Sequence, residues 1–222
     1  MATELILVRH GQAVRKNGDY AQAPLTALGR EQATLTGRHF RDANERFDGF
    51  YSSPLRRARE TAEIIGVEIG LDPLVQNGLQ EMMSYELPPI IILESLARLG
   101  LFHGYLNKNV GKPLRWPIVG RVSTVLTELI ARHPGQSISL VTRGGVISGV
   151  LAWFLPGERQ RWWRDTVDNC SVTRLKVDGS AAELTMFNRT YHLKPQTGVT
   201  PVDGKRQGFE PDLQSERPRS VN

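Results

Sequence analysis

Short apolar runs alternate along the chain with segments whose apolar positions recur every three to four residues. The runs ELILV (4–8) and SISLVT (137–142) have the length and composition of buried strands. Apolar positions that recur every three to four residues are typical of an amphipathic helix. Because strands alternate with helices, we expect an α/β protein with three layers, α/β/α, around a mostly parallel central sheet. The helices are predicted at 27–41, 54–66, 121–135 and 144–157, and further strands at 47–53, 72–81, 168–179 and 182–190.

Local signals predict where several of these elements begin and end. Thr26 is a suitable N-cap for the helix over 27–41. Pro54 is a typical first residue of the next helix, which Gly66 is expected to end. The turn at Asp178–Gly179 predicts a hairpin between the last two strands.

The elements suggest one domain over residues 1–192. Residues 82–115 have the least regular pattern, with a helix predicted after Pro89, and we interpret them as an insertion over the site. Residues 193–222 are rich in Pro, Gly, Gln and charged residues, so they are predicted to form a flexible C-terminal tail.

Composition narrows the class of protein. The chain of 222 residues is 40% hydrophobic and carries a net charge of +5. Its single cysteine, Cys170, excludes an internal disulfide and a cysteine-rich metal site. With no signal-peptide pattern and apolar runs too short to span a bilayer, we expect a cytoplasmic protein without a membrane partner. No Lys/Arg block has interleaved aromatic residues, so the mild basicity favours a small anionic ligand over nucleic acid.

Two predicted strands each end in basic residues directly before a glycine turn. ELILVRHGQA ends on Arg9 and His10 before Gly11, and SLVTRGGVI ends on Arg143 before two glycines. In open α/β sheets, ligands sit at the carboxyl ends of the strands, so these residues can converge although they are more than 130 positions apart. Gly11 would let backbone N–H groups approach a phosphate closely.

A third anion signal lies in SSPLRRARETA (52–62), where a helix is predicted to begin near Pro54. A helix N-terminus favours anions, so arginine in the first turn is unfavourable unless an anion is bound there. Arg56 and Arg57 cannot share a helix face, so only one of them is expected to point into the site.

Taken together, these motifs resemble the histidine phosphatase superfamily, the phosphoglycerate-mutase-like proteins. The resemblance implies a phosphoglycerate-mutase-like fold without a metal ion or cofactor. It rests on LVRHGQ (7–12), PLTALGREQA (24–33), YSSPLRRARETA (51–62), LQE (79–81), LVTRGGVI (140–147) and DNCSVTRL (168–175), in the expected order.

The resemblance also implies residue roles. His10 matches the nucleophile that forms a phosphohistidine, and Glu81 matches the acid that protonates the leaving alkoxide. Arg9 and Arg57, rather than Arg56, match phosphate-clamping arginines. The implied phosphate-binding residues are Arg9, Arg57, Arg143, Gly11 and Gln12.

The sequence departs from the family at Arg143, where the family has a second histidine. Arginine keeps the positive charge and adds a forked donor. It is also longer, and a displacement of about 1 Å at the reacting atoms can slow catalysis ~100-fold. No other histidine has a comparable context: His39 and His133 are interpreted as structural or surface residues, and His103 as one that could line the site.

Three functions therefore stay open. The first is a phosphomonoesterase that hydrolyses a small phosphorylated metabolite through phospho-His10. The second is a weak or inactive member that binds phosphate or a phosphorylated ligand. A phosphoglycerate mutase is less favoured, because Ala13 stands where mutases carry Ser and the elements that usually follow LQE are missing. The partner is a small phosphorylated molecule or inorganic phosphate, and a homodimer is one option for the assembly.

Overall fold

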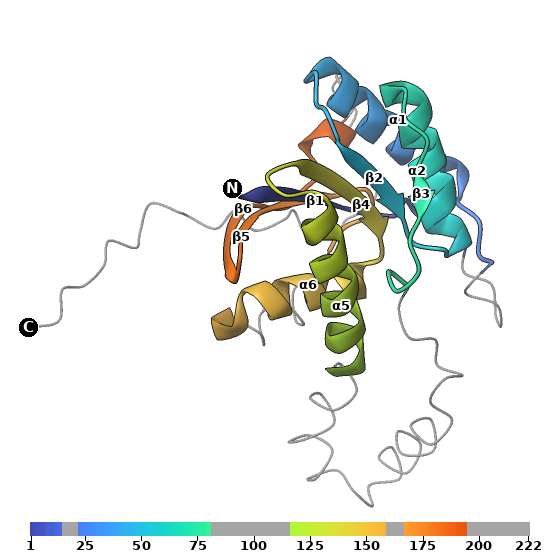
Figure 1. The fold of residues 1–222 in the computed structure, drawn as a ribbon. Helices are drawn as coiled ribbons and strands as arrows, with labels where there is room; N and C mark the ends of the chain where they lie inside the picture. The colour runs from blue at the N-terminus through green and yellow to red at the C-terminus, as the bar shows by residue number, and fades with distance from the viewer. Residues whose placement is uncertain (15–21, 81–115, 159–166, 195–222) are drawn as a thin grey trace, which may run out of the picture.

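The sheet places the ends of its parallel strands at one edge of the molecule (Figure 1). The structure is a computed structural model that describes residues 1–14, 22–80, 116–158 and 167–194. Six strands lie in the order β3-β2-β4-β1-β5-β6. The first four are parallel to one another, while β5 is antiparallel to β1 and β6 to β5. The strands are β1 (Thr3–Arg9), β2 (Gly49–Ser52), β3 (Leu74–Val75), β4 (Ser137–Thr142), β5 (Val172–Asp178) and β6 (Ala181–Arg189).

Helices cover both faces of this sheet, with α1 and α2 on one side and α5 and α6 on the other (Figure 1). Side chains alternate across the strands, so Leu5 and Leu7 of β1 join the apolar cluster under α5 and α6, whereas Ile6 and Val8 join the cluster under α1 and α2. The predicted three-layer α/β/α fold is therefore confirmed. The helices are α1 (Ala27–Asp42), α2 (Arg56–Ile69), α5 (Trp116–Arg132) and α6 (Gly144–Phe154), with short 3-10 helices η2 (Pro156–Glu158) and η3 (Tyr191–Leu193).

Several predicted boundaries are confirmed. Thr26 is the N-cap of α1, and its hydroxyl accepts a hydrogen bond from the Gly29 N–H at 3.0 Å. The hairpin between β5 and β6 turns at Gly179, whose φ of 61° lies in the left-handed region. No helix among the described residues is long and apolar enough to cross a membrane.

The predicted end of α2 at Gly66 is wrong. The helix continues to Ile69, and Gly70 at φ 72° forms its left-handed C-cap. Gly66 has a different reason to be glycine, because a Cβ there would lie 2.3 Å from the Leu71 carbonyl oxygen. The helix predicted after Pro89 lies outside the described residues, as do the whole insertion over 82–115 and the tail after Lys194.

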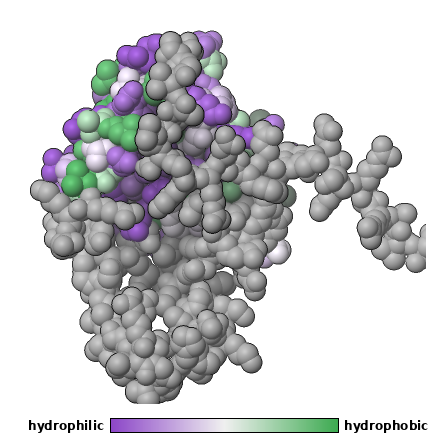
Figure 2. All heavy atoms as spheres, turned by 180° about the vertical axis from the view of Figure 1, so that it is seen from behind, coloured by the Kyte–Doolittle hydropathy of each residue, from purple (hydrophilic) through white to green (hydrophobic). Residues whose placement is uncertain are grey.

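The surface seen from behind mixes hydrophilic and hydrophobic residues over the described part of that face (Figure 2). The exposed large apolar side chains of the described residues include Val67 of α2 and Leu74 and Val75 of the edge strand β3.

Candidate active site

His10 follows β1 directly and is 6% exposed. Its Nδ1 lies 2.7 Å from the Gly11 carbonyl oxygen, which can only accept a hydrogen bond. Its Nε2 lies 3.0 Å from Arg57 Nε, which can only donate one. These two partners define a neutral imidazole with the proton on Nδ1 and the lone pair on Nε2. Nε2 is therefore the nitrogen that is chemically able to act as a nucleophile.

The surroundings of His10 hold it in this neutral form. Burial lowers the pKa of His10 to about 3, although the hydrogen bond to the Gly11 carbonyl acts in the opposite direction. The positive charges of Arg57, Arg9 and Arg143 contribute to this lowering. All three predicted arginines are therefore close enough to His10 to disfavour its protonated form by electrostatic repulsion.

The two candidate arginines of α2 lie on different faces of the helix. Arg57 is 4% exposed and turned toward His10, whereas Arg56 is exposed to solvent. Leu55, the N-cap of α2, provides no side-chain cap to the first N–H groups of this helix.

Arg9 and Arg143 lie on the α6 side of the sheet edge. The Arg9 side chain donates to the Val167 carbonyl through Nη1. A Cβ built on Gly144 would lie 3.7 Å from Arg9 Cδ and Nε, so α6 begins beside Arg9. Arg143 is the N-cap of α6 and likewise provides no side-chain cap. Two helix N-termini and three guanidinium groups therefore meet near His10, an arrangement that favours a phosphate dianion.

Gly11 and Gln12 have structural partners in addition to their predicted role. The Gly11 N–H donates to Thr61 Oγ1 at 3.1 Å. A Cβ on Gly11 would lie 2.4 Å from the Gly29 carbonyl oxygen, so glycine is needed here for close packing against α1. Gln12 Oε1 accepts from the Thr26 hydroxyl at 2.8 Å. Contact of either residue with phosphate stays a prediction.

The sequence reasoning missed the residues that hold His10 in place. Asn169 Nδ2 donates to the His10 carbonyl at 2.8 Å, and the His10 N–H donates to the Thr142 carbonyl at 2.8 Å. Asn169 lies in DNCSVTRL and Thr61 in YSSPLRRARETA, so the signal was their presence in matched motifs. Neither residue type has a side-chain chemistry that would single it out.

Glu81 and His103 lie outside the described residues, so their roles stay predictions. The chain just before Glu81 is anchored at the site edge, because Thr142 Oγ1 donates to the Leu79 carbonyl at 2.7 Å. The other described histidines have structural partners. His133 Nε2 lies 2.8 Å from the Tyr51 hydroxyl, and His39 stacks on His192 with ring centroids 5.1 Å apart.

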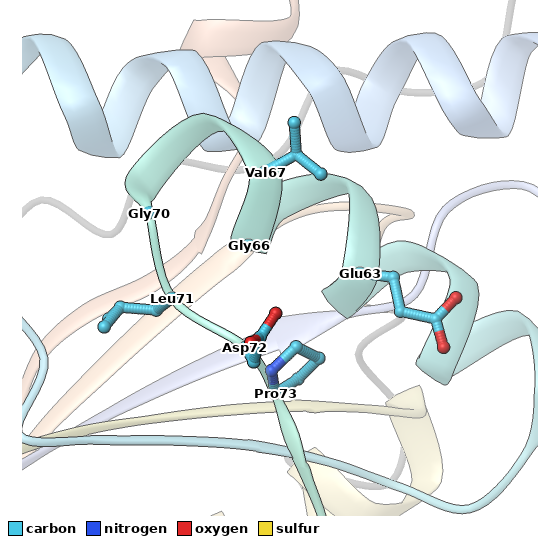
Figure 3. A pocket seen from close by; sticks show the side chains of 7 residues that line it. All are labelled: Glu63, Gly66, Val67, Gly70, Leu71, Asp72 and Pro73. Atoms are coloured by element: carbon cyan, nitrogen blue, oxygen red, sulfur yellow. The ribbon is translucent and has the colours of Figure 1, made fainter.

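Two other kinds of site can be assessed. Within the four described stretches, no three His, Cys, Asp or Glu side chains lie close enough to hold a metal ion. A shallow pocket lies between the end of α2 and the turn before β3 (Figure 3), lined by Glu63, Gly66, Val67, Gly70, Leu71, Asp72 and Pro73. It sits at the opposite end of α2 from Arg57 and is separate from the His10 site.

The fold and the site define an α/β protein that presents a buried neutral histidine, among arginines, at the carboxyl edge of a parallel sheet. The sequence profile of the histidine phosphatase superfamily (branch 1) matches residues 5–190. The chain belongs to this superfamily.

Named relatives agree with this assignment. The chain is 28% identical over 203 residues to "Putative phosphoserine phosphatase 2" of Hydrogenobacter thermophilus, covering 87% of this chain and 98% of the relative. It is 27% identical over 180 residues to a broad-specificity phosphatase of Saccharomyces cerevisiae, covering 76% and 77% of the two chains. The solved structure of Bacillus stearothermophilus YhfR superposes with a TM-score of 0.70 at 24% identity, covering 87% of this chain and all of that one. The family and the relatives support a phosphatase, that is, a phosphoric monoester hydrolase for small metabolites.

Proposed function

We propose that the protein hydrolyses a small phosphorylated metabolite through a covalent phosphohistidine on His10. The observation that carries the proposal is the His10 ring, whose Nδ1 faces the Gly11 carbonyl and whose Nε2 faces the Arg57 guanidinium. This ring carries its lone pair on Nε2, the nitrogen that faces the arginines proposed to hold the phosphate. The chemistry needs no cofactor, because the guanidinium groups supply the positive charge.

The reaction has two halves. In the first, His10 Nε2 attacks phosphorus, the ester P–O bond breaks, and the leaving oxygen takes a proton from the Glu81 carboxyl. In the second, a water oxygen attacks phosphorus, the P–N bond breaks, and Glu81 takes a proton from that water. Inorganic phosphate leaves and His10 is again neutral. The anchoring of Leu79 beside β4 supports Glu81 as this acid, since only Gln80 separates them.

The phosphoenzyme gives the direct test. Incubation with a chromogenic aryl phosphate or with phosphoserine should give a protein-bound phosphate that is labile in acid and stable in base. His10→Ala should abolish both this species and turnover, by more than ~1000-fold. A folded wild-type protein that hydrolyses no member of a broad panel of phosphate esters would contradict the proposal.

Arg143 favours a second candidate, a member that binds phosphate or a phosphorylated ligand with little turnover. Its permanent charge lies near His10 at the start of α6, where it can hold product phosphate tightly. Comparison with Arg143→His separates the two functions. A gain of ~100-fold or more in the variant would show that Arg143 disarms the site, whereas similar rates in both proteins would show a working replacement.

The site is also proposed to operate in the cytoplasm, an environment that suits a chain whose single cysteine is buried and free.

A further inference from the structure

The peptide group between His10 and Gly11 is held at both of its polar atoms by side chains from separate parts of the fold. Its N–H, on Gly11, donates to Thr61 Oγ1 of α2 at 3.1 Å. Its carbonyl, on His10, accepts from Asn169 Nδ2 of the loop before β5 at 2.8 Å. Both distances are those of ordinary hydrogen bonds in proteins. This peptide joins the imidazole to the glycine whose own carbonyl orients the ring.

Thr61 connects this peptide to the helical turn that carries Arg57. Its hydroxyl donates to the Arg57 carbonyl at 2.7 Å, which leaves an oxygen lone pair for the Gly11 N–H. Thr61 is fully buried, so water does not compete for these bonds. One hydroxyl therefore links the chain after His10 to the backbone of the arginine whose Nε contacts His10.

Asn169 is equally well anchored. The next residue, Cys170, donates its N–H to the Arg9 carbonyl at 2.9 Å, and the Arg9 N–H donates to the Ser171 carbonyl at 3.2 Å. Cys170 adopts φ 53°, a left-handed turn that returns the loop to the end of β1. The loop thus extends the pairing of β1 with β5 up to His10 and fixes Asn169 beside it.

We propose that Thr61 and Asn169 are positioning residues that together clamp the His10–Gly11 peptide and so set the approach of His10 Nε2 to the phosphoryl group. The inference rests on the proposed phospho-His10 chemistry for its effect on rate. Rotation of this peptide would displace the Gly11 carbonyl from Nδ1 and tilt the ring. A displacement of about 1 Å at a reacting atom can slow a reaction ~100-fold.

Thr61→Val tests the hydroxyl, because valine keeps the shape and loses both hydrogen bonds. We expect kcat on an aryl phosphate to fall at least ~10-fold, with KM changed by less than ~3-fold. Thr61→Ser keeps the hydroxyl and should restore kcat to within ~3-fold of wild type. Thr127→Val is the matched control, because Thr127 makes the same bond to the carbonyl four residues earlier, at 2.8 Å, but on α5. It should leave kcat unchanged.

A ring-15N NMR spectrum of His10 provides a readout that needs no turnover. The wild-type ring should show the Nδ1–H tautomer, and Thr61→Val should show a mixture of tautomers that Thr127→Val does not. If Thr61→Val fails to fold, Asn169→Ala removes the other half of the clamp and should give the same changes.

The two proposals can fail separately. If the ring signals change in the clamp variants while the wild-type protein shows no turnover, the clamp stands and the phosphatase proposal fails. Unchanged ring signals and rates in both clamp variants would overturn the clamp, as would a Thr61→Ser variant as slow as Thr61→Val.

Discussion

At the scale of single residues, His10 combines two requirements that usually conflict. A site for a phosphate dianion must be strongly positive, and a nucleophilic imidazole must have an unprotonated nitrogen. Burial of the ring and the charges of Arg57, Arg9 and Arg143 act in the same direction, since both lower the pKa of His10. The cations proposed to bind phosphate therefore also keep the proposed nucleophile neutral.

The charge state of His10 can be followed directly. Its pKa of about 3 implies that the ring stays neutral from pH 8 down to about pH 4. Arg143→Gln removes one cation, so the pKa should rise, but it should stay below 6.5 because burial is the main cause. An NMR titration of the ring checks both statements. A wild-type His10 that titrates near pH 6.5 would contradict this account of the site.

Arg57 and Arg56 form a natural matched pair for testing the guanidinium contact. Arg57→Lys loses the Nε donor and the planar fork, so kcat/KM on an aryl phosphate should fall ~100-fold or more. Arg56→Lys changes an exposed neighbour with the same chemistry and should leave kcat/KM within ~2-fold of wild type. Equal effects in the two variants would show that the contact to His10 is unimportant for catalysis.

Residue-level prediction from sequence worked where chain direction fixes position. Arg9 ends β1, His10 follows it, and Arg143 follows the parallel strand β4, so their proximity follows from topology alone. The choice of Arg57 over Arg56 followed from the motif and agrees with its burial. Thr61 and Asn169 could not be assigned roles, because a hydroxyl in a helix or an amide in a loop acquires a role only from its partners in space.

At the scale of elements, the turn after β1 crosses the start of α1 with almost no space between the two backbones. Cβ atoms on Gly11 and Gly29 would lie 2.4 Å and 2.0 Å from opposing carbonyl oxygens. Gln12 completes the contact, because its backbone N–H donates to Gln32 Oε1 at 2.9 Å and its carbonyl accepts from the Thr26 N–H at 2.9 Å. The sequence predicted the helix and its cap but not this contact, since close backbone approach has no local pattern.

Alanine substitution at two helical glycines should therefore have opposite effects. Gly29→Ala forces the turn and α1 apart and should lower the free energy of unfolding by roughly 1–3 kcal/mol. Gly120→Ala, in α5, meets nothing within 4 Å and should raise it by about 0.5–1 kcal/mol through helix propensity. Urea denaturation of both variants measures these changes. A stabilised Gly29→Ala would show that the two backbones are not in close contact.

At the scale of the whole molecule, the end of the described chain packs back onto the first helix and toward the site loop. After β6, η3 places His192 against His39 of α1, with the two rings 14° from parallel. His192 Nε2 also lies 3.1 Å from the Cys170 carbonyl, next to Asn169. Burial and, to a smaller extent, the neighbouring His39 lower the pKa of His192 to about 4.

Histidines with lowered pKa values, His10 and His192 above all, make the stability of the whole fold depend on pH. The folded pKa values of His10 and His192 are about 3 and about 4, below the ordinary value of 6.5 that the unfolded chain has. Below pH 6.5 the unfolded chain therefore binds protons that the folded protein does not, so stability falls as the pH falls toward 4. Each such histidine contributes a slope that rises to about 1.4 kcal/mol per pH unit as its unfolded ring becomes fully protonated.

Denaturant unfolding between pH 6.5 and 5, where most carboxylates stay ionised, isolates this dependence. His192→Gln should reduce the slope by up to about 1.4 kcal/mol per pH unit, because the protonation difference of this ring is removed. Gly120→Ala is the control, since it changes no titratable group, and it should leave the slope unchanged. Constant wild-type stability across this range would contradict this account. It would show that the folded protein takes up protons on these rings as readily as the unfolded chain does. The packing of η3 onto α1 would then not depend on a neutral His192.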